Sequence, residues 1–156
     1  MKTKASVFLF PIICIFIFSL SACLKDGISP YNLPYFYINK DTRGEIEVSW
    51  SRKDTVDYKV YLSAQQQSQA IELQYEIIVG EGLLEGRDFK LITAGNKLTF
   101  APGVTESPIR IAWMAAALDP AKKNTLTIRL SANSKNYRMG LPGPDELQRQ
   151  LVIRKN

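Results

Sequence analysis

The segment 71–79, IELQYEIIV, alternates apolar and polar side chains and decides the fold class. Successive side chains of a β-strand point to opposite faces, so this alternation predicts a strand with one buried face. The apolar positions are Ile71, Leu73, Tyr75, Ile77 and Val79.

The same period of two recurs on both sides of this segment. The further segments with this pattern are 45–50, 58–63, 98–100, 109–113, 125–130 and 151–153. Turn-forming residues separate them, at 41–44, 80–86, 94–96, 102–103 and 141–144. Seven or eight short strands at this spacing predict an all-β, antiparallel two-sheet sandwich of the immunoglobulin-like type. Short helical turns are expected at most at 114–118 or 145–148.

Two tryptophans stand at positions that continue the alternating apolar residues of their segments. Trp50 follows Ile46 and Val48, and Trp113 follows Ile109 and Ile111. Core packing is therefore expected for both side chains. The alternative is an exposed tryptophan that stacks on sugar rings.

Further aromatic residues gather near the start of the predicted domain, at Tyr31, Tyr35, Phe36 and Tyr37. We expect them to begin the first strand and to be buried, with an exposed patch for a partner as the alternative. Near the other end of the sequence, Tyr137, Arg138 and the 141–145 loop could form a binding edge, although a loop of this composition is usually only a connection.

The N-terminus has the pattern of a secretory signal. Lys2 and Lys4 precede an almost wholly apolar run over 5–20. Pro11 interrupts this run, which is shorter than the roughly 20 apolar residues that span a bilayer. A cleaved signal is therefore expected rather than a transmembrane anchor.

The signal ends in Leu20-Ser21-Ala22-Cys23, which resembles the lipobox of bacterial lipoproteins. The resemblance implies that the Cys23 thiol receives a diacylglycerol and that the chain is cut before it. Residues 1–22 are then the signal peptide, 23–34 a lipidated tether and 35–156 the sandwich domain. The alternative is a secretory signal with an incidental cysteine.

The residues after the lipid site bear on localisation. Leu24 stands where the inner-membrane retention signal of many Gram-negatives has aspartate. Lys25 and Asp26 resemble part of a surface-export signal, although Gly27 replaces a second acidic residue. We expect a lipid-anchored outer-membrane protein on the cell surface, with the periplasmic face and a merely solvated tether as alternatives.

Composition excludes several classes of function. The chain has no histidine, which removes Ser-His-Asp and Cys-His catalysis and the usual zinc sites. It has no glycine-rich phosphate loop and no basic stripe for nucleic acid. The only cysteines are Cys14 and Cys23, so the mature domain has no disulfide. We expect no enzyme and no cofactor, although a catalytic carboxylate pair stays formally possible.

The order of features over 75–111 resembles the Calx-beta domain. Gly86-Arg87-Asp88-Phe89 matches its G-x-D-[YF] element, and 98–103 matches a strand that ends in F-x-P-G. The segments 124–131 and 151–156 resemble its next and closing strands. A lipoprotein signal before such a sandwich also resembles the DUF4843-like lipoproteins of gut Gram-negatives.

Some Calx-beta domains bind calcium through clustered carboxylates. Glu81, Glu85 and Asp88 lie close in sequence, but the acid-rich loops of those binders are missing. We therefore assign no metal ligand, because calcium needs six to eight oxygen ligands. Asp88 is expected instead to cap its turn by accepting hydrogen bonds from backbone amides.

Taken together, these patterns predict a non-catalytic binding module, anchored in the membrane through the lipid on Cys23. Its expected ligand is a glycan, or an envelope or host protein, by family analogy. The alternative is a periplasm-facing structural accessory subunit of an envelope complex, with a sheet edge that augments a partner's sheet.

Overall fold

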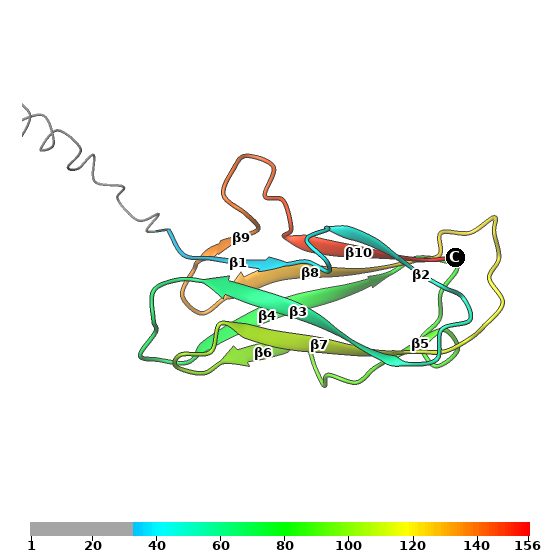
Figure 1. Ribbon diagram of the computed structural model, residues 1–156, viewed down its shortest axis with the longest axis horizontal. Coiled ribbons are helices and arrows are strands. Elements are labelled where there is room, and N and C mark those ends of the chain that lie inside the picture. The colour runs from blue at the N-terminus through cyan, green and yellow to red at the C-terminus, as the bar shows by residue number, and fades with distance from the viewer. Residues whose placement is uncertain (1–32) are drawn as a thin grey trace, which may run out of the picture. The chain divides into compact units, whose positions relative to one another are not determined.

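Ten strands form two five-stranded sheets in the computed structural model, which describes residues 33–156 (Figure 1). The strands are β1 (Tyr35–Ile38), β2 (Glu45–Val48), β3 (Thr55–Ser63), β4 (Ile71–Val79), β5 (Phe89–Leu91), β6 (Lys97–Phe100), β7 (Glu106–Trp113), β8 (Thr125–Asn133), β9 (Arg138–Met139) and β10 (Gln150–Lys155). One sheet has the order β5-β7-β3-β1-β9 and the other β2-β10-β8-β4-β6. The predicted signal peptide, Cys23, Lys25, Asp26 and Tyr31 lie outside the described residues.

The all-β, two-sheet prediction is confirmed, but the strand count and the pairing were wrong. Ten described strands replace the expected seven or eight, and the sheets are mixed because β1 pairs with β9 and β10 pairs with β2 in parallel. The strands that the sequence did not indicate are β5 and β9, of three and two residues. Strands this short show no readable period.

The core lies between the sheets and consists mainly of the side chains that the alternating pattern predicts to be buried. Ile71, Leu73 and Tyr75 of β4 are buried, as are the alternating apolar residues of β3, β7, β8 and β10. The pattern weakens at the end of β4, where Val79 is 41% exposed. The reason is the neighbouring strand, because the ladder between β4 and β6 ends at Gln74.

Trp113 is buried in the core, as predicted, at 2% exposure. Its indole nitrogen Nε1 donates a hydrogen bond of 2.8 Å to the hydroxyl of Tyr58, which is fully buried. Burial raises the pKa of Tyr58 to about 12, partly offset by that hydrogen bond. The pair gives both buried polar groups a partner inside an apolar core.

Neither expected helical turn forms. The backbone of 114–118 is held extended by two hydrogen bonds, from Met114 N to Asp88 O (3.0 Å) and from Ala116 N to Trp50 O (3.4 Å). In 145–148, Glu146 and Gln148 have positive φ values of 45° and 60°, which a right-handed helix excludes. Within 33–156, no helix is long and apolar enough to cross a membrane.

Candidate ligand-binding groove

Trp50 is exposed, contrary to the prediction that it packs in the core. Its side chain is 53% exposed, whereas Val48, two residues earlier, is buried. Strand β2 ends at Val48, and a turn follows in which Arg52 N donates to Ser49 O at 3.1 Å. The period of two ends with the strand, so parity no longer fixes the direction of the Trp50 side chain.

The backbone of Trp50 is held on both sides. Its N–H donates to the carbonyl oxygen of Asn156, just after β10, at 2.6 Å, and its carbonyl oxygen accepts from Ala116 N at 3.4 Å. Trp50 therefore joins the end of β10 to the segment after β7. These contacts place an exposed indole on a fixed backbone. The backbone therefore loses little conformational entropy when a ligand binds.

An open groove of about 610 Å³ begins at Trp50. Ala117, Leu118 and Pro120 supply further apolar surface, and Leu118 also packs on the core. The cationic side chains along the groove are Lys122, Lys123, Arg154 and Lys155, and no Asp or Glu side chain lines it. An aromatic ring beside apolar surface and cations suits a ligand with a ring face and polar or anionic substituents.

The connection from β7 to β8 forms one side of the groove. A turn at 119–122 is closed by Lys122 N, which donates to Asp119 O at 3.2 Å. The carboxylate of Asp119 also accepts from Ala121 N at 3.0 Å, and Asn124 Nδ2 donates to Asp119 O at 2.9 Å. These local hydrogen bonds fix the turn that carries Lys122 and directly precedes Lys123.

Two glycines allow this connection to pack closely against the chain that follows β4. A Cβ at Gly80 would lie 2.3 Å from Lys123 O, and one at Gly82 would lie 1.9 Å from Asn124 Oδ1. Both backbone nitrogens donate across this contact, Gly80 to Thr125 O and Gly82 to Lys123 O. Glycine is required here because any side chain would displace the lysine-bearing turn.

The cations differ in how far they are neutralised. Arg154 forms an ion pair with Glu45 on the neighbouring strand β2, and Lys122 lies 3.9 Å from Asp119 Oδ2. Lys123 has no ion-pair partner among residues 33–156, and its side chain is exposed. Lys122 and Lys123 are thus the cations most available to a ligand.

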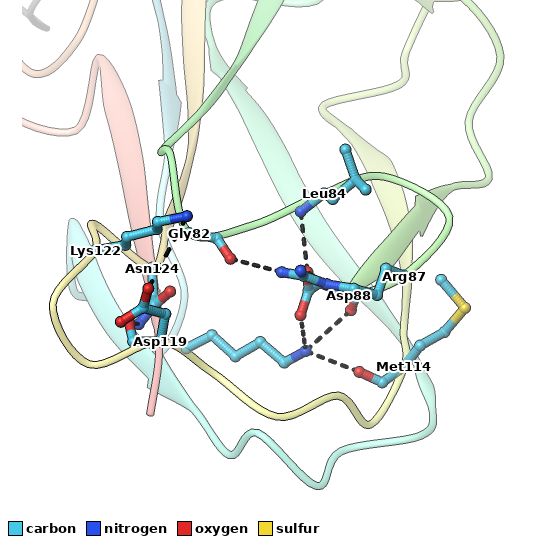
Figure 2. Close-up of polar contacts among 9 residues, drawn as sticks. Gly82, Leu84, Arg87, Asp88, Met114, Asp119, Lys122 and Asn124 are labelled. Carbon is cyan, nitrogen blue, oxygen red and sulfur yellow. Dashed lines mark hydrogen bonds and ion pairs between the residues drawn. The ribbon is translucent and has the colours of Figure 1, made fainter.

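Lys155 belongs to the groove wall but directs its charge into the protein. It is 1% exposed, and its Nζ donates to Asp88 Oδ1 at 3.0 Å and to Met114 O at 2.8 Å (Figure 2). Asp88 is also fully buried, and its Oδ2 accepts from Leu84 N at 2.9 Å and from Arg87 Nε at 2.7 Å. Each buried charge therefore has an opposite charge and further hydrogen-bond partners.

The environment of Asp88 favours its carboxylate form. Burial alone raises the pKa of Asp88, but the hydrogen bonds from Leu84 N, Lys155 and Arg87 outweigh burial and hold that pKa below its ordinary value of 3.8. Asp88 is consequently a carboxylate at neutral pH. Its contact with Lys155 connects the end of β10 to the turn before β5.

We expect Asp88 to make the domain sensitive to acid. Because its pKa is lower in the folded state, its contribution to the free energy of unfolding is present above about pH 4 and is lost as the pH falls through the folded-state pKa. Urea unfolding followed by circular dichroism between neutral and acid pH should show this loss. The dependence of the free energy of unfolding on pH should become weaker in Asp88→Asn and should persist in Asp145→Asn, whose side chain is exposed. Equal slopes in wild type and Asp88→Asn would contradict the assignment.

The predicted role of Asp88 as a turn cap is confirmed by its bond from Leu84 N, but its partner Lys155 was missed. The other two acids do not join it in a cluster. Glu85 accepts from Leu91 N at 3.2 Å, and no group of three metal-ligating acidic, histidine or cysteine side chains occurs in the described part of the chain. Both carboxylate oxygens of Asp88 are already occupied.

The remaining candidate aromatic residues lie elsewhere. Phe36 is buried as expected, but Tyr35 and Tyr37 are only partly buried. The rings of Tyr37 and Tyr61 stack at 5.1 Å between centroids, and Tyr35 lies 5.6 Å from Tyr37. This tyrosine row covers part of the outer face of the β3–β1 region, apart from the groove.

The loop between β9 and β10 makes its contacts within the domain. Tyr137 packs against the core, and its hydroxyl donates to Gln67 Oε1 at 2.8 Å. Arg138 of β9 donates to the carbonyl oxygen of Gly143 in the loop. Within the loop, Glu146 pairs with Arg149, and Gln148 donates to Thr42 O at 3.1 Å. These contacts are those of a connection, so Trp50 marks the stronger candidate site.

The groove and the first described residues lie at opposite ends of the sandwich (Figure 1). β1 begins opposite Ser63 at one end of β3, whereas Trp113, followed by the groove segment, is hydrogen-bonded to Asp54 just before the other end of β3. No protein-family model matches the chain, and the search of curated proteins finds no match. The function is therefore argued from the chemistry of the groove.

Proposed function

We propose that the chain is a non-catalytic, lipid-anchored outer-membrane lipoprotein whose domain binds a glycan in the groove beside Trp50. The observation that carries this proposal is the exposed indole of Trp50 on a doubly hydrogen-bonded backbone. An indole face stacks on the C–H face of a sugar ring, and polar groups around it bind hydroxyls.

The proposal includes the place of the domain in the cell. Lys25 and Asp26 are the proposed export signal to the cell surface. The immunoglobulin-like topology and the Calx-beta or DUF4843-like relationship belong to the same proposal, and they rest on the motifs at 86–89 and 98–103.

Replacing Trp50 with alanine should abolish glycan binding and leave the fold intact. Truncating a central tryptophan at a binding site costs at least about 2 kcal/mol, or about thirtyfold in affinity. Isothermal titration calorimetry of the full-length protein in detergent, with a panel of oligosaccharides, measures this loss. The chain has two tryptophans, so fluorescence of the wild type supplies a second readout from Trp50 over a constant signal from buried Trp113.

The matched control is Leu147→Ala, because Leu147 is 62% exposed and does not line the groove. It should bind like the wild type. Trp50→Ala should change the free energy of unfolding by less than about 1 kcal/mol, since most of its side chain is already in solvent. Unchanged glycan affinity in Trp50→Ala would remove the groove as the binding site.

The second candidate function is that of an accessory subunit on the periplasmic face, and one observation favours it. The ladder from β4 to β6 ends at Gln74, so that side of β4 has no strand partner over 76–79 within the described residues. Ile78 and Val79 on this stretch are 39% and 41% exposed. An unpaired edge with apolar side chains can add a strand from a partner protein. Co-purification of a fixed partner that Ile78→Lys disrupts would favour this role.

A further inference from the structure

We propose that the groove selects oligosaccharides that carry an anionic group, a uronate carboxylate or a sulfate ester. This inference rests on the proposed glycan-binding function and adds the class of ligand. Lys122 and Lys123 would contact the anionic group while the sugar ring stacks on Trp50.

The charges of the groove carry the inference. Of its four cationic side chains, Lys155 is neutralised by buried Asp88 and Arg154 by Glu45. Lys123 has no ion-pair partner in the described part of the chain, and the Lys122 contact with Asp119 is long, at 3.9 Å. No acidic side chain among residues 33–156 lines the groove, so Lys123 and the weakly paired Lys122 leave a positive potential beside the aromatic ring.

The two lysines are also positioned. Backbone and Asp119 hydrogen bonds close the 119–122 turn that carries Lys122, and the following segment 122–125, which includes Lys123, packs closely on Gly80 and Gly82. Lysine binds sulfate or carboxylate as a point charge, so the groove chemistry is shared by both groups.

An anionic membrane surface would offer a similar charge, but the geometry favours the sugar. The groove is a concave site of about 610 Å³. Such a site suits a small ligand that enters it better than it suits a planar membrane surface.

The test compares ligands that differ in charge alone. Oligogalacturonate is titrated beside its methyl-esterified, neutral counterpart, and a sulfated galacto-oligosaccharide forms the second anionic arm. Trp50 fluorescence and calorimetry of the full-length protein in detergent report binding. Lys122→Gln/Lys123→Gln should weaken binding of an anionic oligosaccharide about fivefold and leave the weaker, neutral ligand unaffected. Added salt should reduce wild-type affinity toward that of the variant.

The control variant is Lys97→Gln/Lys135→Gln, which removes the same charge outside the groove. It should bind like the wild type. Equal binding of charged and esterified ligand, unaffected by Lys122→Gln/Lys123→Gln, would overturn the charge selectivity and leave glycan binding standing. Failure of every oligosaccharide would overturn both proposals. Binding to anionic phospholipid vesicles in place of the sugars would assign the groove to a membrane and overturn the inference.

Discussion

Replacing Asp88 with alanine is expected to destabilise the domain by about 3–5 kcal/mol, the loss measured when one partner of a buried ion pair is removed. The substitution leaves the Lys155 ammonium fully buried with only carbonyl acceptors, and the backbone nitrogen of Leu84 loses its acceptor. Urea unfolding at neutral pH, followed by circular dichroism, measures the difference in free energy. An Asp88→Ala variant within about 1 kcal/mol of the wild type would contradict a buried ionic pair.

Two further variants separate the ion pair from simple packing. Lys155→Met should cost less than Asp88→Ala, because the Asp88 carboxylate keeps Arg87 and the Leu84 N–H as partners. The double variant Asp88→Ala/Lys155→Met should recover part of the loss, because neither charge of the pair then stays buried. A coupling energy near zero in this double-mutant cycle would show that the two side chains act independently.

The strands of the core could be predicted because apolar parity and burial agree in them. Segment 71–79 became β4, and Leu126, Ile128 and Leu130 of β8 are all buried. The parallel pairing of β1 with β9 and of β10 with β2 could not be predicted. The alternation of side chains shows which face of a strand is buried, but it does not show which strand lies beside it or in which direction that strand runs.

The candidate site was harder to predict, and for two different reasons. The prediction that Trp50 is buried was wrong because nothing in 45–50 marks where β2 ends. Trp50 lies two residues beyond the strand, where the alternation no longer fixes the direction of a side chain. Lys155 did leave a signal, since it stands on the apolar parity of Leu151 and Ile153. A lysine at a core position requires a buried acid, but its partner lies 67 residues away and no local pattern identifies Asp88.

Replacing Cys23 with alanine is expected to release the protein from the membrane almost completely. The lipobox resemblance makes Cys23 the site of diacylglycerol attachment and of signal cleavage before it. Each buried acyl CH₂ contributes about 0.8 kcal/mol, so two or three chains anchor the domain stably and the variant has no such anchor. Fractionation of cells into membrane and soluble parts measures the shift, and mass spectrometry of the N-terminal peptide should find the lipid on Cys23. Wild-type protein in the soluble fraction would contradict the lipoprotein assignment.

The same cells test on which side of the outer membrane the domain lies. If Lys25 and Asp26 direct export, protease added to intact cells should degrade the wild-type domain, and Lys25→Ala/Asp26→Ala should protect it while leaving it membrane-bound. Cys23→Ala serves as the control for a domain without an anchor. Protection of the wild-type domain until the outer membrane is breached would contradict surface display. The open side of β4 at 76–79 would then be the first place to look for a periplasmic partner, ahead of the groove at Trp50.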